Sequence, residues 1–309
     1  IKGMKKLESK GKIPEPLEKG ILRAKYSLPT FRDGTIRYDM SDVPLTHFTP
    51  LEINTSYSKL VELGYTHDIH GMPLTSEKQV IELFPQDFVV SKNCMEFMSR
   101  VANFIDDLLE RYYQTDRFYN VEIFEDLVGQ LIIGLAPHTS GGVLGRIIGW
   151  SDTSGGYAHP LFHAAKRRNC DGDEDCIMLL MDGLLNFSRQ LLPNRRGGLM
   201  DAPLVLTTRL NPHEIDKEAL NVDAAWNYSA EFYEATDKML HSKEVEDMMG
   251  TITSRLKEGQ FVALRGLGFT HGTENLSTGP ALSSYKTLET MKDKMNGQLA
   301  LGHRLRSVD

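Results

Sequence analysis

Alternate carboxylates in one short segment are the residues of this sequence most suited to chemistry. Asp171, Asp173 and Asp175 lie two residues apart in the run Asn-Cys-Asp-Gly-Asp-Glu-Asp at 169–175. Side chains two apart on an extended backbone point to the same side, so these carboxylates would converge. Because like charges repel, such a group favours a bound cation, and oxygen ligands suit Mg²⁺, Mn²⁺ or Ca²⁺. We therefore predict a divalent-metal site in residues 169–175, the acidic turn.

An acidic run is also typical of a solvated loop, so the metal site needs further support. A strand-like apolar run at 176–181 follows the turn directly, which a solvated loop does not require. Cations flank the turn on one side only, and they are Lys166, Arg167 and Arg168. A calcium loop of the EF-hand type is excluded, because Cys176 and Asp182 stand where that pattern requires Gly and Glu.

Motifs on both sides of the turn resemble a known family. They are His-Pro-Leu at 159–161, Ala-Ala-Lys-Arg-Arg-Asn at 164–169, Asp-Gly-Asp at 171–173, Leu-Asn-Phe-Ser at 185–188, Arg-Gly-Gly at 196–198 and Met-Asp-Ala-Pro-Leu at 200–204. Together with Gly-Leu-Ala-Pro-His-Thr-Ser at 134–140, they resemble the catalytic segment of the large subunit of archaeal family D DNA polymerase, over the whole chain. A more distant similarity is to the largest subunit of multisubunit RNA polymerases, which has an aspartate where this chain has Asn169.

The resemblance implies an α+β fold in which flanking helices and irregular segments surround a double-psi β-barrel catalytic core. It also implies a replicative DNA-directed DNA polymerase that transfers a dNTP to a primer 3′-hydroxyl and releases pyrophosphate, using two Mg²⁺ ions or Mn²⁺ in their place. In this reading Asp171 and Asp173 bridge the ions and Asn169 is a weaker ligand or an orienting group. Asp175 is an outer partner of the metal site.

Basic and polar residues near the turn are candidates for contacts with phosphate groups. Lys166, Arg167 and Arg168 would offset phosphate charge, because ammonium and guanidinium groups pair with phosphate oxygens. Arg195 and Arg196 stand in a Gly-rich basic loop that either binds the nucleic-acid backbone or is solvated. His138 opens another Gly-rich loop, where it contacts template, primer or nucleotide unless it is an ordinary polar loop residue.

The family resemblance implies partners beyond this chain. These are primer–template DNA, dNTP, the remainder of the same large subunit with a sister barrel, a small exonuclease subunit and a sliding clamp. Such polymerases also use lysines from the sister barrel, and no matching motif occurs here, so we expect the fragment alone to be inactive. Two other classes stay open from the residues alone: an RNA polymerase-like nucleotidyltransferase, and a non-catalytic module that binds calcium or another protein.

Bulk composition is that of an ordinary globular protein, with 309 residues, 40% hydrophobic and 25% charged. The net charge of −7 disfavours nucleic-acid binding in general, but residues 159–211 hold seven Lys or Arg against six Asp or Glu, which bound metal would make positive. The three cysteines form no CxxC pair, so we predict neither a zinc site nor disulfides in this segment and expect a cytoplasmic protein. Association with the nucleoid is what the family resemblance implies. No apolar run is long enough for a membrane span. Because the chain starts without Met, we expect a piece of a longer subunit.

Four segments are predicted along the chain: a mixed accessory segment at 1–90, a connecting helix at 91–118, the barrel with the acidic turn at 119–212, and a mostly helical segment at 213–309. Apolar periodicity predicts a helix over 92–114 with Asp106, Asp107 and Glu110 on its solvated face. Strands are expected at 87–91, 121–124, 130–135, 143–150, 176–181, 204–210 and 261–267. Other helices are expected at 76–84, 182–192, 224–241, 243–258 and 285–301.

Overall fold

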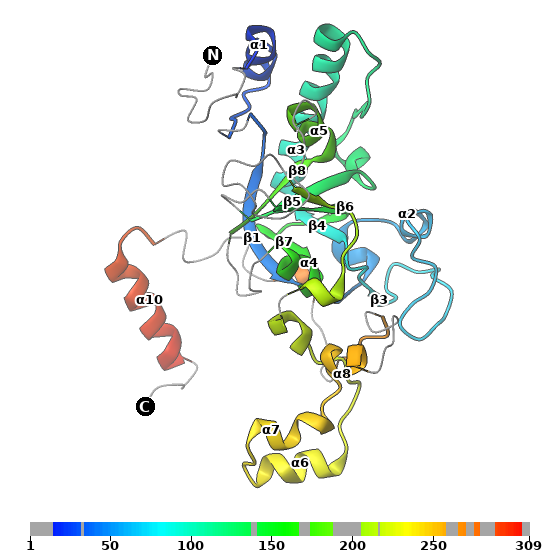
Figure 1. The fold of residues 1–309 in the computed structure, drawn as a ribbon, viewed down its shortest axis with the longest axis vertical. Coiled ribbons are helices and arrows are strands. Elements are labelled where there is room, and N and C mark those ends of the chain that lie inside the picture. Colours follow the sequence, from blue (N-terminus) through cyan, green and yellow to red (C-terminus); the bar gives the residue numbers. More distant parts are fainter. Residues whose placement is uncertain are drawn as a thin grey trace.

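A computed structural model describes residues 15–31, 34–136, 141–166, 174–187, 205–215, 217–257, 265–269, 275–278 and 288–304, and helices surround a central sheet in it (Figure 1). The strands are β1 (Tyr38–Pro44), β2 (His47–Phe48), β3 (Ile81–Glu82), β4 (Asp87–Ser91), β5 (Leu131–Leu135), β6 (Gly141–Ser151), β7 (Gly155–Ala158), β8 (Glu174–Leu179) and β9 (Val205–Thr207). The helices are α1 (Leu17–Lys25), α2 (Tyr57–Glu62), α3 (Lys92–Leu108), α4 (Pro160–Ala165), α5 (Leu180–Phe187), α6 (Ala230–Asp237), α7 (Ser242–Val245), α8 (Ile252–Lys257) and α10 (Met291–Arg304).

The sheet closes on itself into a barrel. Among the described residues, six strands follow the order β4-β7-β1-β8-β5-β6, and the second half of β6 pairs again with β4. The first residues of β6, Gly141 to Val143, pair with β9 along the same edge. The pairing is mixed, because β1 lies parallel to β7 and antiparallel to β8. This mixed α and β architecture with a closed barrel confirms the predicted fold class. Strands β1 and β4 come from before residue 119, so the sheet uses more of the chain than the range 119–212.

Strand β8 is buried on both faces, because it lies between two apolar clusters. Ile177 and Leu179 belong to the main core, which also contains the inward face of α3. Cys176 and Met178 belong to a smaller cluster that they share with strand β5. This alternation follows from the two-residue period of a strand. A continuous apolar run is therefore what this central position requires. The strand predicted at 176–181 is confirmed as far as Leu179, and the next residue begins α5.

Helix α3 follows the predicted apolar periodicity. The hydroxyl of Ser91 accepts a hydrogen bond from the Cys94 N–H (3.2 Å) and caps the first turn. Met95, Met98 and Val101, which recur at helical spacing, are fully buried in the main core. The helix continues through a π-helical turn at 109–113 and ends at Gln114, which has a left-handed backbone (φ 55°). The helix predicted over 92–114 is thus confirmed.

Several predictions from local pattern were wrong. Residues 76–84 contain β3 and turns in place of a helix, and 121–124 leads into a 3₁₀ turn at 124–127 in place of a strand. The predicted helices at 224–241 and 243–258 are broken into the shorter α6, α7 and α8. The strand expected at 204–210 is described as β9 only, and most of 261–267 lies outside the described residues. Short segments of this kind adopt whatever their tertiary contacts favour.

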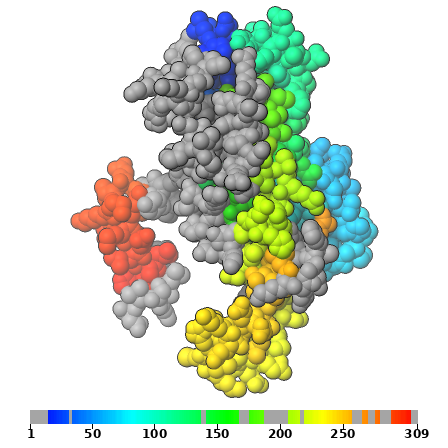
Figure 2. Space-filling model, viewed as in Figure 1, coloured from blue at the N-terminus to red at the C-terminus, as the bar shows by residue number. Residues whose placement is uncertain are grey.

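The C-terminal elements lie away from the barrel. Helices α6 and α7 form the lowest part of the molecule in Figure 1 and Figure 2, and α10 stands at the left of both views. None of the helices in the described part of the chain is long and apolar enough to cross a membrane.

Candidate functional site

Helix α4 begins at the His-Pro-Leu motif for a local reason. The Nδ1 atom of His159 accepts a hydrogen bond from the Leu161 N–H (3.2 Å) and so caps the helix. Pro160 takes the first helical position, where its missing N–H leaves no bond unmade. His159 is fully buried, and burial together with nearby His47 lowers its pKa to about 3, so its ring is neutral. The motif therefore fixes where α4 starts.

Two glycines let α4 approach the sheet closely. A Cβ at Gly134 of β5 would lie 2.8 Å from Cε1 of Phe162, and one at Gly145 of β6 would lie 3.0 Å from the same ring. The contact at Gly134 is shorter than real Cβ atoms show, and the one at Gly145 is tighter than nine in ten real contacts, so the position of the Phe162 ring requires glycine at 134 and favours it at 145. This packing holds α4 and the residue that follows it, Lys166, against the barrel.

Lys166 points into the barrel, with a relative exposure of 2%. Its Nζ forms an ion pair with Oδ2 of Asp175 and lies 3.3 Å from Nδ1 of His163. The rings of Phe162 and Phe88 have their centroids 4.7 and 5.6 Å from the same nitrogen. Aromatic faces attract a cation, and here they enclose one that is removed from water.

Asp175 stands at the start of β8 and is fully buried. Its Oδ1 accepts a hydrogen bond from the Cys176 N–H (2.8 Å), while its Oδ2 contacts Lys166 and lies 3.6 Å from Nδ1 of His163. Strand β8 runs antiparallel to β1, which places Asp175 opposite Met40. Both oxygens of this carboxylate are therefore engaged within the protein.

His163 and Asp42 complete the group. The Nε2 of His163 lies 3.1 Å from the carbonyl oxygen of Val43, an acceptor, so it carries the ring proton. Burial, and then the charge of Lys166, hold the pKa of His163 well below its ordinary value, so the ring is neutral and Nδ1 accepts from Lys166. Asp42 on β1 is also buried, and its Oδ2 lies 3.7 Å from the same Nδ1. We call Asp42, His163, Lys166 and Asp175 the α4–β8 cluster.

Only two of the predicted site residues lie in the described part of the chain, and the structure brings these two together. They are Lys166 and Asp175, which form the ion pair described above. The others lie outside the described residues: Asn169, Asp171, Asp173, Arg167, Arg168, His138, Arg195 and Arg196. Across the described residues, no group of three or more His, Cys, Asp or Glu side chains is arranged to hold a metal ion. The predicted metal ligands and phosphate contacts therefore stay predictions.

Comparison with known proteins identifies the family. A family model described as the DNA polymerase II large subunit DP2, catalytic domain, matches residues 1–294. The chain belongs to this family. Relatives named DNA polymerase II large subunit are 58% identical in Methanocella arvoryzae, 56% in Methanococcoides burtonii and 55% in Pyrococcus furiosus, each over 100% of this chain. The matches cover 27%, 27% and 24% of those relatives, so the chain spans about a quarter of their length. The resemblance seen in the motifs is confirmed.

Sequence reasoning missed two members of the α4–β8 cluster in this family member. His163 stands three residues before Lys166, a spacing that places both on one face of a helix, and this signal was available. Asp42 had no local signal, because it joins the cluster only through the pairing of β1 with β7 and β8.

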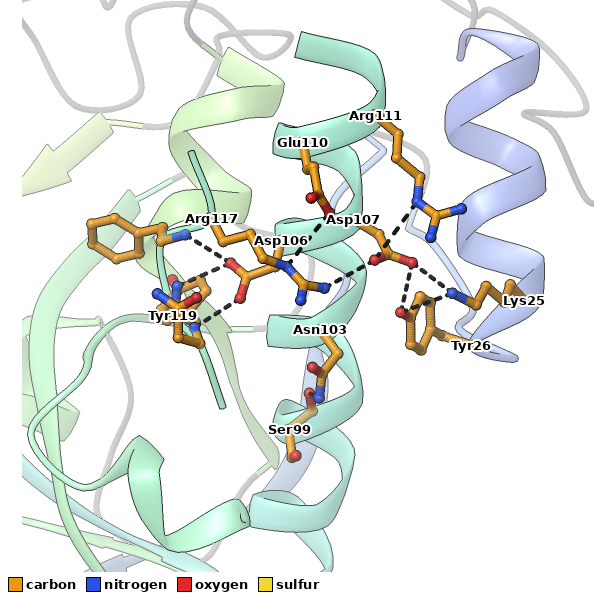
Figure 3. Close-up of polar contacts among 12 residues, drawn as sticks. Lys25, Tyr26, Ser99, Asn103, Asp106, Asp107, Glu110, Arg111, Arg117 and Tyr119 are labelled. Atoms are coloured by element: carbon orange, nitrogen blue, oxygen red, sulfur yellow. Dashed lines mark hydrogen bonds and ion pairs between the residues drawn. The ribbon is translucent and has the colours of Figure 1, made fainter. Parts of the chain in front are cut away.

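The prediction that Asp106 and Asp107 are solvated was wrong. Asp106 is 1% exposed, and its carboxylate accepts hydrogen bonds from the backbone N–H groups of Phe118, Tyr119 and Asn120 at 2.8–2.9 Å (Figure 3). These bonds hold the segment that leaves the helix against its last turns. Glu110 alone is exposed, as predicted. Helical periodicity could not reveal a chain segment that returns over the polar face.

Asp107 is also buried, and it contacts cations from α1, from the π-helical turn at 109–113 and from the segment after that turn. Its carboxylate contacts Lys25 Nζ (2.7 Å), Tyr26 Oη (2.7 Å) and Arg117 Nη2 (3.1 Å), and Arg111 Nε lies 3.9 Å away (Figure 3). Burial by itself would raise the pKa of Asp107, but the hydrogen bonds from Lys25 and Tyr26 outweigh it and hold the pKa below its ordinary value. We call Asp106, Asp107 and their partners the α3-end cluster.

Proposed function

We propose that this chain carries the metal-binding part of the active site of a replicative DNA-directed DNA polymerase. The observation that carries this proposal is the family match over residues 1–294, which includes the acidic turn. The reaction would transfer a nucleotide from a dNTP to the 3′-hydroxyl of a primer and release pyrophosphate. The fold around the turn supports the proposal. Helix α4 precedes segment 167–173, and β8, a strand of the closed barrel, follows it.

We assign the metal ligands from the chemistry of the donor set. The carboxylates of Asp171 and Asp173 and the amide oxygen of Asn169 suit Mg²⁺, with Mn²⁺ as a substitute. Two bound ions would lower the barrier by activating the 3′-hydroxyl and neutralising the leaving pyrophosphate. Asp175 supports the site without ligating metal, because both its oxygens are engaged with protein groups.

Basic residues around the turn would bind phosphate. Arg167 and Arg168 are assigned to the triphosphate, and Arg195 and Arg196 to the nucleic-acid backbone, since guanidinium groups form paired hydrogen bonds with phosphate oxygens. His138 is assigned to template, primer or nucleotide. Each contact would hold the reacting groups in line, which lowers the entropic part of the barrier.

We further propose the partners of the intact enzyme. They are primer–template DNA, dNTP, the remainder of the large subunit with its sister barrel, a small exonuclease subunit and a sliding clamp. The cytoplasm, at the nucleoid, is the compartment where these meet. The fragment of 309 residues alone is expected to be inactive, because it supplies about a quarter of the length of its relatives.

The decisive experiment is primer extension by the full-length large subunit, assembled with its partner and carrying Asp171→Asn and Asp173→Asn together. Removing both charges barely changes side-chain volume but removes the attraction for metal. We expect extension to fall by a factor on the order of a thousand or more, because both metal-dependent roles are lost. DNA binding should persist when measured by fluorescence anisotropy.

A matched control removes two carboxylates elsewhere. Glu122→Gln with Glu125→Gln makes the same charge change at two exposed positions, and we expect extension to stay within about twofold of the parent, as for ordinary surface substitutions. Normal extension by the Asp171 and Asp173 double variant would contradict the proposed function.

A further inference from the structure

The two described ends of segment 167–173 are joined by side chains. Lys166 directly precedes this segment, Asp175 follows it by two residues, and the two form an ion pair that is fully buried. This contact between residues nine apart fixes the separation of the two described ends of the segment. Both ends are anchored, by α4 packed through Phe162 and by β8 paired between β1 and β5.

We propose that the α4–β8 cluster is a positioning device that holds the base of the acidic turn and thereby sets the geometry of its metal ligands. This rests on the proposed function of the turn and goes beyond it, because it gives a role to His163 and changes that of Lys166. Lys166 acts through Asp175 and touches neither phosphate nor metal. Asp175 in turn keeps β8 and α4 at one separation.

The burial and the contacts of Lys166 indicate that it positions the turn and does not bind the incoming nucleotide. Lys166 is 2% exposed, and its ammonium group lies between Asp175, His163 and two aromatic rings. A group that offsets the charge of an incoming nucleotide has to be reached by that nucleotide. A buried ion pair adds little net stability compared with apolar residues of similar volume, so its value lies in fixing one arrangement.

His163 connects this pair to the barrel wall. It donates from Nε2 to the carbonyl of Val43 on β1 and accepts from Lys166 at Nδ1. A neutral imidazole can do both at once, whereas a protonated ring would face the lysine ammonium with a second positive charge. Strand β1 therefore holds Lys166 through His163, and it also holds β8 through backbone pairing.

The test compares single and double replacements in the full-length large subunit, assembled with its partner and bound to a primer–template whose primer lacks a 3′-hydroxyl. Binding of Mn²⁺ is measured by electron paramagnetic resonance, so turnover is not needed. We expect Lys166→Met and Asp175→Leu each to weaken Mn²⁺ binding by about 10- to 100-fold, as loss of an outer partner does at other metal sites. The double variant Lys166→Met with Asp175→Leu should recover affinity to within a few fold of the parent, because two apolar side chains fill the same space.

If Lys166 and Asp175 contacted phosphate or metal directly, the double variant would not recover affinity. If Asp175 ligated metal, or Lys166 bound phosphate, the double variant would bind Mn²⁺ or dNTP no better than the worse single variant, and the proposal would be overturned. A control is another ion pair of the barrel, Arg146 with Asp87 (2.7 Å), in which the carboxylate is buried and the guanidinium is partly exposed. Arg146→Met with Asp87→Leu also removes the acceptor of the buried Tyr65 hydroxyl (2.6 Å), so it should lower thermal stability while leaving the Mn²⁺ affinity of the folded enzyme unchanged.

A second pair of variants covers the case in which the first double variant does not fold. His163→Gln keeps an acceptor for Lys166, whereas His163→Leu removes it. We expect His163→Leu to weaken Mn²⁺ binding by roughly tenfold and His163→Gln to stay close to the parent. Equal affinity for the parent and both variants would overturn the positioning role. Failure of the proposed function is distinguishable, because Asp171→Asn with Asp173→Asn would then leave Mn²⁺ binding intact.

Discussion

The α4–β8 cluster and the α3-end cluster both bury two carboxylates, but they satisfy them differently. In the α3-end cluster, Asp106 accepts three backbone N–H groups, and the cations around Asp107 are 43–60% exposed at their side chains. In the α4–β8 cluster, the cation is as buried as the carboxylate it contacts. The first arrangement ties surface segments to a helix end, whereas the second keeps a charged contact in the middle of the fold.

The difference shows how the surroundings of a carboxylate indicate its role. A carboxylate that bonds several backbone N–H groups substitutes for secondary structure, and this accounts fully for Asp106. Asp175 bonds one N–H, that of the next residue, and otherwise faces a lysine and a histidine. A purely structural role would be served as well by apolar side chains there. The proposed positioning of the acidic turn, which begins three residues after Lys166 and ends at Asp175, accounts for the ion pair in this place.

Removing the cation should separate the two clusters most strongly. Lys166→Met leaves Asp175 buried without its cation, which costs about 3–5 kcal/mol of local stability. Arg117→Met at the α3-end cluster should cost about 1 kcal/mol or less, because that pair is solvated. Hydrogen exchange of the α4 and β8 peptides, compared with the α3 peptides, measures both in the full-length subunit. Equal losses would mean that burial of the cation does not distinguish the clusters.

Removing a carboxylate tests the α3-end cluster on its own. Asp106→Ala deprives three backbone N–H groups of their acceptor, and we expect a cost of about 2–3 kcal/mol. The loss should appear as faster hydrogen exchange across 117–121. Glu110→Ala, an exposed acid on the same helix, serves as the control and should change stability by less than about 0.5 kcal/mol. A similar effect of both substitutions would restore the view that Asp106 is solvated.

As pH falls, the region around α4 should lose stability before the α3-end cluster does. His159 is neutral in the folded state down to a pKa of about 3, whereas an unfolded histidine takes up a proton below about pH 6.5. The unfolded state then binds more protons, so stability around α4 falls as pH falls through this window, by on the order of 2 kcal/mol at about pH 5. His159→Asn keeps a capping oxygen without titrating and should make the dependence less steep, while buried His163, whose pKa is also lowered on folding, contributes the remainder. Protection factors corrected for the intrinsic exchange rate at each pH measure this.

The α3-end cluster should respond to acid only at lower pH, and to salt. The pKa of Asp107 is lowered on folding, so its contribution is present above the unfolded pKa of about 3.9 and is lost as pH falls through the folded value. Its exposed cations are screened when salt rises from about 0.1 M to about 1 M. We expect a small loss of protection at the α1–α3 contact and none at α4 and β8. An equal salt effect on α4 would contradict the buried position of Lys166.

Much of the fold was predictable where the pattern is long or continuous. The helix over 92–114 and the strands at 87–91, 130–135 and 143–150 agree with α3, β4, β5 and β6. The failures were short segments, such as 76–84 and 121–124, in which a few apolar residues fit more than one period. The six-strand closure was implied by the family resemblance and not by periodicity, because it depends on pairings between distant segments, such as Tyr38 of β1 with Ile177 of β8.

The candidate site divides in the same way. Residue types and spacing alone indicated a metal-binding acidic turn with flanking cations, because converging oxygen ligands and charge repulsion are local properties. Only the tertiary structure decided that Lys166 and Asp175 contact each other, that His163 and Asp42 join them, and that Asp106 and Asp107 are buried. Burial depends on which distant segments cover a residue, and the local sequence around a charged residue does not show whether it is covered.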